Sequence, residues 1–278
     1  MLSRLLAERM SHFLGQPVVV EARPGANTVV GAEVVARATP DGYVFLVTTN
    51  STHTTNPAMM PNLPYDGARS FAPITLLSMG SIVLSAPAAA PFRDVPGFLA
   101  WAKARGRATY GSWGIGSSAH LYGEMLRTRE GAPLEHVPYR GEQPAIADVL
   151  GGRLDATFAS PVGARPQRDA GRLKLLGVPA AARSPALPDV PTFAEQGLEG
   201  YDIPLFVAAW APAGTPRPVI ARLHAAFSAA LADPAIRRAM LDQGQTPVLS
   251  SPEELSAAVA RDTPRWAELV RLSGARAE

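Results

Sequence analysis

Short apolar strands that alternate with amphipathic helices are the feature that most constrains the fold of this 278-residue chain. In a first alternation, a helix over residues 1–14 precedes an apolar strand at residues 18–20, a helix over residues 27–38 and an apolar strand over residues 43–49. Strands that are apolar on both faces and joined by helical crossovers are typical of a parallel sheet covered on both sides. The first alternation therefore predicts an α/β fold.

A second alternation predicts another sheet further along the chain. Before it, two apolar stretches lie between residues 71 and 86, and Asp94 with Pro96 opens a helix that runs through residue 104. Strands are then expected over residues 108–112, 134–139, 154–160 and 173–178, with helices over residues 117–129 and 143–150 and a short helix ending near residue 170.

The end of the chain is mostly helical. An apolar strand over residues 205–211 is followed by three helices that open near Pro216, near Pro234 and at Ser251. Ser251 and Glu254 have the spacing of a capping box, which marks a helix start. Pro264 lies inside the last helix and is expected to break or kink it, because proline lacks the N–H that a helix interior uses.

The length of the chain fits two lobes better than one core. The helical tail is longer than the second alternation needs, so we expect the chain to leave the first lobe near residue 105 and return near residue 205. The first lobe then comprises residues 1–105 and 205–278, and the second comprises residues 106–204. Two crossing segments form a hinge, and a ligand is expected between the lobes at the carboxyl ends of the strands.

Composition excludes several classes of protein and site. The chain has no cysteine, which excludes disulfides, thiolate metal sites and cysteine nucleophiles. Its 26 Lys and Arg residues against 24 Asp and Glu leave a net charge of only +2, which disfavours nucleic acid as a partner. No stretch approaches the roughly 18 consecutive apolar residues of a membrane-spanning helix, and no secretory signal is visible.

Motifs that carry catalysis are absent from the sequence. The chain contains no G-x-S-x-G elbow, no H-E-x-x-H pair and no Walker loop. Its histidines do not pair with carboxylates at ligand spacing, and Asp148 and Asp155 fall on different elements rather than forming an acid and base pair. We therefore expect no catalytic residue, no metal site and no enzyme.

The most informative segment runs from Gly111 to His120, because it follows a strand and opens a helix. Its glycines let the backbone approach a ligand, its serines can cap the helix, and the unpaired N–H groups of the first turn attract an anion. The alternative is an ordinary strand-to-helix turn that needs only a cap. His120 would lie in the first helical turn, where the helix dipole disfavours its charged form, so we expect a neutral hydrogen-bonding role.

Part of the same segment, Gly114 to Ala119, matches a dinucleotide fingerprint. Such a fingerprint requires an acidic residue at the end of the next strand, roughly 20 residues further on. Glu135 has the right count but lies at the beginning of that strand, and Tyr139 and Arg140 occupy its end. An NADP-binding α/β oxidoreductase that uses Arg140 is therefore the alternative function.

Polar residues at other strand ends are further candidates for ligand binding. Asn50 and Ser51 follow the strand of the first lobe, and Ser160 ends a strand of the second. Short polar side chains at such positions also serve the turns in which they stand. Arg140 can clamp a carboxylate with two parallel hydrogen bonds, although an unpaired surface arginine is the simpler interpretation.

Many short motifs occur in one order along the chain. They lie at residues 14–25 (LGQPVVVEARPG), 40–43 (PDGY), 56–57 (NP), 63–66 (LPYD), 71–73 (FAP), 111–120, 136–141 (HVPYRG), 148–155, 183–192 (RSPALPDVPT) and 211–216 (APAGTP). Over almost its whole length the sequence resembles the extracytoplasmic solute receptors of tripartite tricarboxylate transporters, also called the Bordetella uptake family.

The resemblance implies a two-lobed periplasmic-binding fold of type II, with two mostly parallel sheets flanked by helices. Such a receptor closes like a flytrap on a small carboxylate and delivers it to membrane permease subunits, without cofactor or metal. A sensory partner of a membrane kinase on the same fold is a further alternative.

Residues that match the family's site are expected to bind the carboxylate. In the second lobe these are Ser112, Gly116, Ser117 and Ser118, with His120, Arg140 and Ser160 nearby, and Asn50 and Ser51 face them from the first lobe. Tyr139 and Trp210 are expected as wall residues.

The resemblance also implies a signal peptide, a strand and a Pro/Gly-rich loop ahead of the first helix. We expect that the start of this chain was set too late or that the chain was trimmed, and that the full protein is periplasmic; a genuine start at Met1 would make it cytoplasmic.

Overall fold

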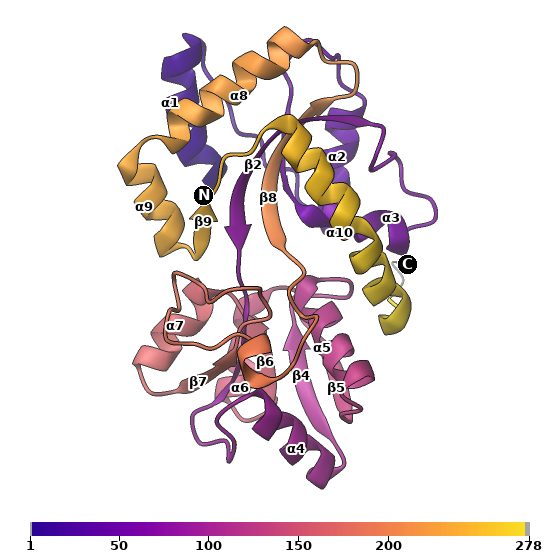
Figure 1. Cartoon of the computed structure of the whole chain (residues 1–278), viewed down its shortest axis with the longest axis vertical. Helices are drawn as coiled ribbons and strands as arrows, with labels where there is room; N and C mark the ends of the chain where they lie inside the picture. Colours follow the sequence, from indigo (N-terminus) through magenta and orange to yellow (C-terminus); the bar gives the residue numbers. More distant parts are fainter. Residues whose placement is uncertain (1, 276–278) are drawn as a thin grey trace. The chain divides into compact units, whose positions relative to one another are not determined.

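The computed structural model describes residues 2–275. Their contacts divide into two compact units, which we call unit 1 (Met1–Gly80 and Leu205–Ala267) and unit 2 (Ser81–Pro204 and Glu268–Glu278). The chain passes between the units after residues 80, 204 and 267. Each unit contains a sheet flanked by helices, which confirms the predicted α/β class (Figure 1).

The first boundary between the units lies at residue 80 rather than near residue 105. β3 (Val83–Pro87) pairs with β6 (Ala156–Ala159) and β7 (Leu173–Gly177), so it belongs to the sheet of unit 2. α4 (Val95–Arg105) follows β3 in the same unit. The two apolar stretches of residues 71–86 look alike in sequence, and only the strand with which each one pairs assigns it to a sheet.

Unit 1 contains a sheet in the order β1-β8-β2-β9, formed by β1 (Leu46–Thr49), β2 (Phe71–Gly80), β8 (Leu205–Pro212) and β9 (Gln245–Pro247). Its described pairings are all antiparallel. The expectation of a mostly parallel sheet therefore does not hold for these residues. β8 follows unit 2 in the chain and lies between β1 and β2 in the sheet. Its local sequence does not indicate whether it runs parallel or antiparallel to them.

Helices cover both faces of this sheet. α1 (Leu2–Leu14), α8 (Arg217–Leu231) and α9 (Pro234–Asp242) pack on one face, where α1 and α8 lie side by side (Figure 1). α2 (Val29–Ala36) and the first part of α10 (Pro252–Ser273) pack on the other. Successive residues of β8 face the two layers in turn, which is the period-two pattern of a strand that is buried on both sides. A short helix, α3 (Asn56–Met59), follows β1.

Residues 18–20 do not form the expected strand. Val19 is 84% exposed, and the Val18 N–H donates to Ser11 Oγ at 2.8 Å. Three valines favour the extended backbone, but a strand also needs a hydrogen-bonded neighbour. The described residues 2–275 supply no such neighbour to this segment.

Unit 2 contains a sheet in the order β5-β4-β6-β3-β7. β4 (Ala108–Ser112) lies parallel to β5 (Leu134–Pro138) on one side and to β6 on the other, while β3 is antiparallel to β6 and β7. α5 (Ser118–Arg129), α6 (Glu142–Leu150) and α7 (Pro161–Asp169) each follow one of the parallel strands. The carboxyl ends of β4, β5 and β6 therefore share one edge of the sheet, which we call the strand-end edge.

α10 continues through Pro264, so the expected break is absent. Thr263 Oγ1 donates to the carbonyl oxygen of Val259 at 2.7 Å, and Trp266 is fully buried just beyond the proline. Proline removes one hydrogen bond from the helix, but the free energy gained by burying α10 on both sides of Pro264 is larger than this loss. The capping box is confirmed, since Ser251 and Glu254 exchange hydrogen bonds of 2.8 and 3.1 Å.

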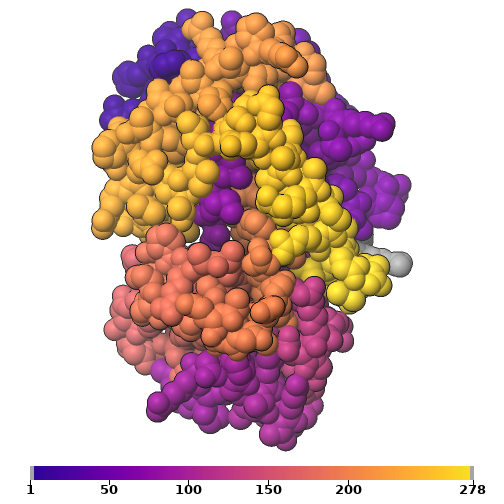
Figure 2. Space-filling view, in the orientation of Figure 1, coloured from indigo at the N-terminus to yellow at the C-terminus, as the bar shows by residue number. Residues whose placement is uncertain are grey.

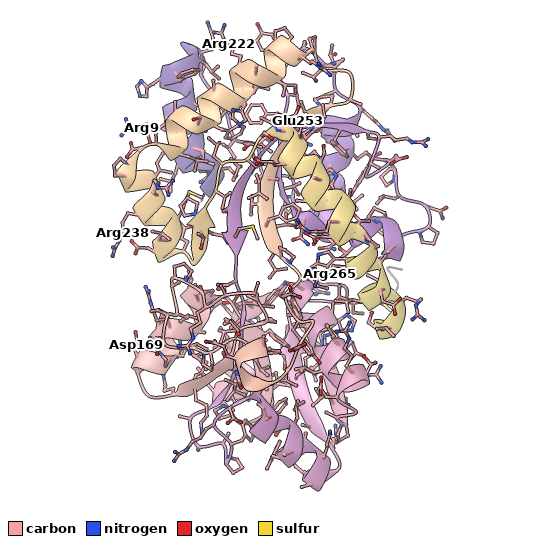
Figure 3. All side chains as sticks on the ribbon, viewed as in Figure 1. Arg9, Asp169, Arg222, Arg238, Glu253 and Arg265 are labelled. Atoms are coloured by element: carbon pink, nitrogen blue, oxygen red, sulfur yellow. The ribbon has the colours of Figure 1, made fainter. Side chains whose placement is uncertain are left out.

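The outer surface of unit 1 carries α8, α9 and α10 (Figure 2). Arg9, Arg222 and Arg238 point outward from α1, α8 and α9 (Figure 3). Arg9 pairs with Asp233 at 2.6 Å and Arg238 with Asp242 at 3.1 Å, so acidic groups are interspersed with these basic ones.

Across the described residues, no helix taken alone has both the length and the apolarity to cross a bilayer. α8 and α9 reach that length and apolarity only as a pair bent by 78°.

Candidate functional site

The strand-end edge of unit 2 collects most of the residues that the sequence singled out. The loop of residues 113–117 connects β4 to α5, residues 139–141 connect β5 to α6, and Ser160 connects β6 to α7. Parallel pairing brings these connections together, because Ser112 lies opposite Pro138 and Gly111 lies opposite Thr157. The amino termini of three helices therefore meet at this edge.

Two glycines shape the loop between β4 and α5. Gly114 has φ 128° and Gly116 has φ 74°, backbone conformations that side-chain-bearing residues rarely adopt. The turn that they form places Ser117 at the N-cap of α5. Its hydroxyl donates to the Gly114 carbonyl oxygen at 2.6 Å and accepts from the His120 N–H at 3.3 Å. The predicted cap is confirmed.

The hydroxyl of Ser112 turns back into unit 2. It lies 2.6 Å from His136 Nε2 and accepts the N–H of Gly114 at 3.1 Å. It also donates to the Gly114 carbonyl oxygen at 3.1 Å. Burial, together with neighbouring His120, lowers the pKa of His136 to about 3, so its ring is neutral near pH 7.

His120 holds the loop from below. Its Nδ1 accepts the N–H of Gly116 at 3.1 Å, and its ring stacks on that of His136 with centroids 4.0 Å apart. Burial lowers the pKa of His120, while the nearby Glu124 carboxylate acts in the opposite direction. The neutral hydrogen-bonding role expected for His120 therefore agrees with its surroundings, and that role is to position the loop.

A buried carboxylate anchors the helix beneath this loop. Glu124 Oε1 accepts the hydroxyl of Tyr110 at 2.8 Å, and its Oε2 accepts from Arg127 Nε at 2.6 Å. Burial first, and Glu124 second, raise the pKa of the Tyr110 hydroxyl, so it stays a donor. These contacts fix α5 against β4 and leave the loop little freedom to rearrange.

The open donors of the loop are fewer than the sequence alone implies. Four backbone N–H groups already donate to acceptors within the protein, those of Gly114, Gly116, Ser117 and His120. At the first two positions of α5, the N–H groups of Ser118 and Ala119 have no acceptor among residues 2–275. Both point along the positive end of the helix dipole, where an anion is favoured.

Tyr139 and Arg140 stand on the neighbouring loop. The hydroxyl of Tyr139 donates to Asp148 Oδ2 at 2.6 Å, and its backbone N–H donates to the Ser112 carbonyl oxygen at 2.9 Å. Its ring packs on the core of unit 2, and Arg140 is exposed. Asp148 also binds Arg153, whereas Asp155 binds Arg105, which agrees with the expectation that the two aspartates do not form an acid and base pair.

Ser160 does not offer the free polar group that was expected of it. Its N–H and its hydroxyl both donate to the carboxylate of Glu142, at 2.9 Å each. The same hydroxyl accepts the N–H of Gly163 at 3.2 Å as the N-cap of α7. Sequence reasoning missed Glu142, because the capping partner comes from another helix.

The first-unit candidates begin a polar segment after β1. Asn50 is 4% exposed, and its backbone carbonyl oxygen accepts from the N–H groups of His53 and Thr54. Ser51 is half-buried, and its carbonyl oxygen accepts from Thr55 Oγ1 at 3.4 Å. Asn50 Nδ2 donates to Thr54 Oγ1 at 3.4 Å, and Thr54 Oγ1 donates to the Asn50 carbonyl oxygen at 2.9 Å, so these two side chains satisfy the turn in which they stand.

A larger polar network beside this turn was missed. Asn56 Nδ2 donates to the carbonyl oxygen of Asn27, and Asn27 Nδ2 donates to Asn56 Oδ1, both at 2.7 Å. These bonds hold Ala26, Asn27 and Thr28 in left-handed conformations, with φ of 42°, 48° and 80°. Strain at three consecutive residues without glycine persists only where surrounding contacts enforce it. The paired asparagines were the available signal.

Trp210, which was expected as a wall residue, packs in the core of unit 1. It is 5% exposed, and its ring lies on that of His53 with centroids 3.9 Å apart. His53 Nδ1 lies 2.8 Å from the Gly67 carbonyl oxygen, so Nδ1 carries the proton. Neither Trp210 Nε1 nor His53 Nε2 has a hydrogen-bond partner in the described part of the chain.

Metal-ligating groups do not gather at either site. Within residues 2–275, no three side chains of His, Asp or Glu lie close enough to hold a metal ion. The strand-end edge presents open backbone donors at Ser118 and Ala119, and the Ser112 side chain is fully buried beneath its loop.

A two-unit α/β fold in which open helix-start N–H groups lie at one sheet edge fits the class of solute-binding proteins. The family model described as "Tripartite tricarboxylate transporter family receptor" matches residues 2–274. The chain belongs to this family of receptors. Receptors of this family bind small carboxylates and work with membrane components of a transporter.

Individual relatives agree in sequence and in fold. The "UPF0065 protein in tcbD-tcbE intergenic region" of Pseudomonas sp. (strain P51) is 36% identical over 272 residues, covering 97% of this chain and 80% of the relative. The solved periplasmic binding protein BugD is 34% identical with a TM-score of 0.84, covering 100% of this chain and 93% of BugD. Rpa4515 of R. palustris, solved with adipate, is 31% identical with a TM-score of 0.87, covering 99% and 93%.

Proposed function

We propose that the protein is a periplasmic receptor that captures a small carboxylate and delivers it to the permease subunits of a tripartite tricarboxylate transporter. The adipate bound to Rpa4515 supports this class of ligand. The NADP-binding alternative is disfavoured, because the family and the solved relatives are binding receptors.

The observation that carries the proposal is the pair of open N–H groups at Ser118 and Ala119. Their loop is held by the contacts of Ser112, His120 and His136, so it is shaped before a ligand arrives. Preorganised donors lose less entropy on binding than mobile ones do. In unit 1, Asn50 and Ser51 remain candidates for ligand contacts.

Removing a single backbone donor tests the proposal. Ser118→Pro deletes the N–H at the first helical position, where proline is well tolerated, and the extended ψ of 157° at Ser117 suits a following proline. We expect the variant to fold normally and to bind adipate about 10- to 100-fold more weakly, since a hydrogen bond to a charged group contributes about 1.5–3 kcal/mol. Titration calorimetry measures the change.

Ser118→Ala is the matched control, because it removes the hydroxyl and keeps the N–H. It should bind within about threefold of the unsubstituted protein. If no member of a panel of small carboxylates binds the unsubstituted protein, the receptor function is wrong. If Ser118→Pro binds as tightly as Ser118→Ala, the carboxylate lies elsewhere.

Delivery to a permease needs its own experiment. The purified receptor, loaded with its carboxylate, should bind vesicles that contain the membrane subunits of a tripartite tricarboxylate transporter from the same organism and should not bind empty vesicles. Equal binding to both kinds of vesicle would contradict the proposed partner.

A further inference from the structure

Glu142 places a fixed negative charge at the strand-end edge. Its Oε2 accepts the N–H of Ser160 and its Oε1 accepts the Ser160 hydroxyl, both at 2.9 Å. Ser160 is the N-cap of α7, so the carboxylate occupies the position at which the start of that helix would otherwise favour an anion. The Glu142 carboxylate therefore offsets the positive end of the α7 dipole.

The neighbouring backbone makes room for this carboxylate. A Cβ atom on Gly163 would lie 1.8 Å from Glu142 Oε1, far inside contact distance. Gly163 lies in the first turn of α7, where glycine is otherwise unfavourable. The absence of a side chain at residue 163 and the two hydrogen bonds at Ser160 together show a seat that is built for a carboxylate.

No basic side chain offsets the charge. Among the described residues, Glu142 forms no ion pair, and its hydrogen-bond partner is Ser160 alone. Arg140, two residues earlier, is exposed and does not pair with it. Glu142 is half-buried, so solvent screens its charge only in part.

The charge also lies close to the open donors of α5. β4 and β6 are adjacent parallel strands, and Gly111 pairs with Thr157, three residues before Ser160. Neighbouring strands are about 4.8 Å apart, so the start of α7 lies roughly one or two strand spacings from the start of α5. Over one or two strand spacings, the charge of Glu142 acts on a ligand whose first carboxylate binds Ser118 and Ala119.

We propose that Glu142 is a specificity-determining residue that disfavours a second carboxylate, so that the receptor prefers carboxylates whose other end is neutral or cationic. The inference rests on the proposed function and deepens it. It separates this receptor from Rpa4515, whose solved ligand, adipate, carries two carboxylates.

Three ligands of one chain length test the inference: adipate, hexanoate and 6-aminohexanoate. Titration calorimetry compares the unsubstituted protein with Glu142→Gln, which keeps the size of the side chain and an oxygen acceptor but removes the charge. We expect Glu142→Gln to improve the affinity ratio of adipate over hexanoate roughly 3- to 30-fold, from one charge repulsion at that separation. The affinity for 6-aminohexanoate should fall.

Glu199→Gln is the control for net charge, because Glu199 is an exposed acidic residue of unit 2 outside this edge. It should leave all three ratios unchanged, and added salt should reduce the discrimination by the unsubstituted protein. An unchanged adipate-to-hexanoate ratio in folded Glu142→Gln overturns the inference and leaves the proposed function standing. Failure of the unsubstituted protein to bind any of the three ligands or the wider carboxylate panel overturns both.

Discussion

Residues of this protein often have a different use from the one that their type suggests. Ser112, Ser117 and His120 were expected to touch a ligand, but their described contacts shape the loop that presents Ser118 and Ala119. A hydroxyl or an imidazole in a Gly-rich turn has several acceptors and donors within reach, and sequence spacing does not rank them. The most constrained charge at the edge, Glu142, belongs to another helix.

His53 gives a prediction at the scale of one residue. Burial lowers its pKa to about 4, against an ordinary value of 6.5, so the unfolded chain binds more protons between these two pH values. The resulting stability is present above pH 6.5 and is lost as the pH falls toward 4. We expect a loss on the order of 3 kcal/mol from this group.

Chemical denaturation at pH 7, 5.5 and 4 measures the effect. His53→Asn retains a donor toward the Gly67 carbonyl oxygen and cannot be protonated, so its stability should depend less steeply on pH. His120 and His136 act in the same direction, which leaves a residual slope. His12→Asn is the control, because His12 is exposed, and it should leave the dependence of the unfolding free energy on pH unchanged. If His53→Asn and His12→Asn show the same dependence on pH, the prediction is wrong.

Elements show where periodicity was sufficient and where it was not. Helices α8, α9 and α10 begin where proline and capping residues indicated. Residues 18–20 have the composition of a strand but pair with no other strand of the described residues. Pro264 would be expected to break a helix, but α10 continues through it because the helix is buried there. In both cases tertiary contacts, or their absence, outweigh local propensity.

α7 provides a prediction at the scale of elements. Gly163→Ala introduces a Cβ that overlaps Glu142 Oε1, so the carboxylate must leave Ser160 or α7 must shift. We expect a destabilisation of about 1–3 kcal/mol, the usual cost of overpacking. Thermal and urea unfolding measure it.

The double variant Gly163→Ala with Glu142→Ala tests the cause. Removing the carboxylate removes the closest overlap and leaves only Ile146 Cδ1, 2.9 Å from the new Cβ. The double variant should therefore be more stable than the sum of the two single changes implies. Additive effects would show that Gly163 serves another purpose.

The whole molecule divides by strand pairing and not by chain order. Unit 2 receives β3 and α4 at its start and the last residues of α10 at its end. The chain therefore crosses between the units three times, once inside a helix. We expect these crossings to act as the hinge of the proposed receptor.

Small-angle scattering tests this expectation. If the units close on a carboxylate, a saturating ligand should reduce the radius of gyration, and Ser118→Pro should require a proportionally higher ligand concentration for the same change. A radius that does not respond to a ligand shown to bind by calorimetry would contradict closure.

The amino-acid sequence by itself determined the α/β class, most helix starts, the capped loop before α5 and, through many ordered motifs, the family. These properties depend on interactions between residues that are close in the sequence, or on short motifs that can be read directly from it. Tertiary structure alone decided the direction of β8, the unit to which β3 belongs, and the neighbour that binds Ser160. Each of these depends on hydrogen bonds between segments far apart in the chain, and such bonds form only after the segments have been brought together.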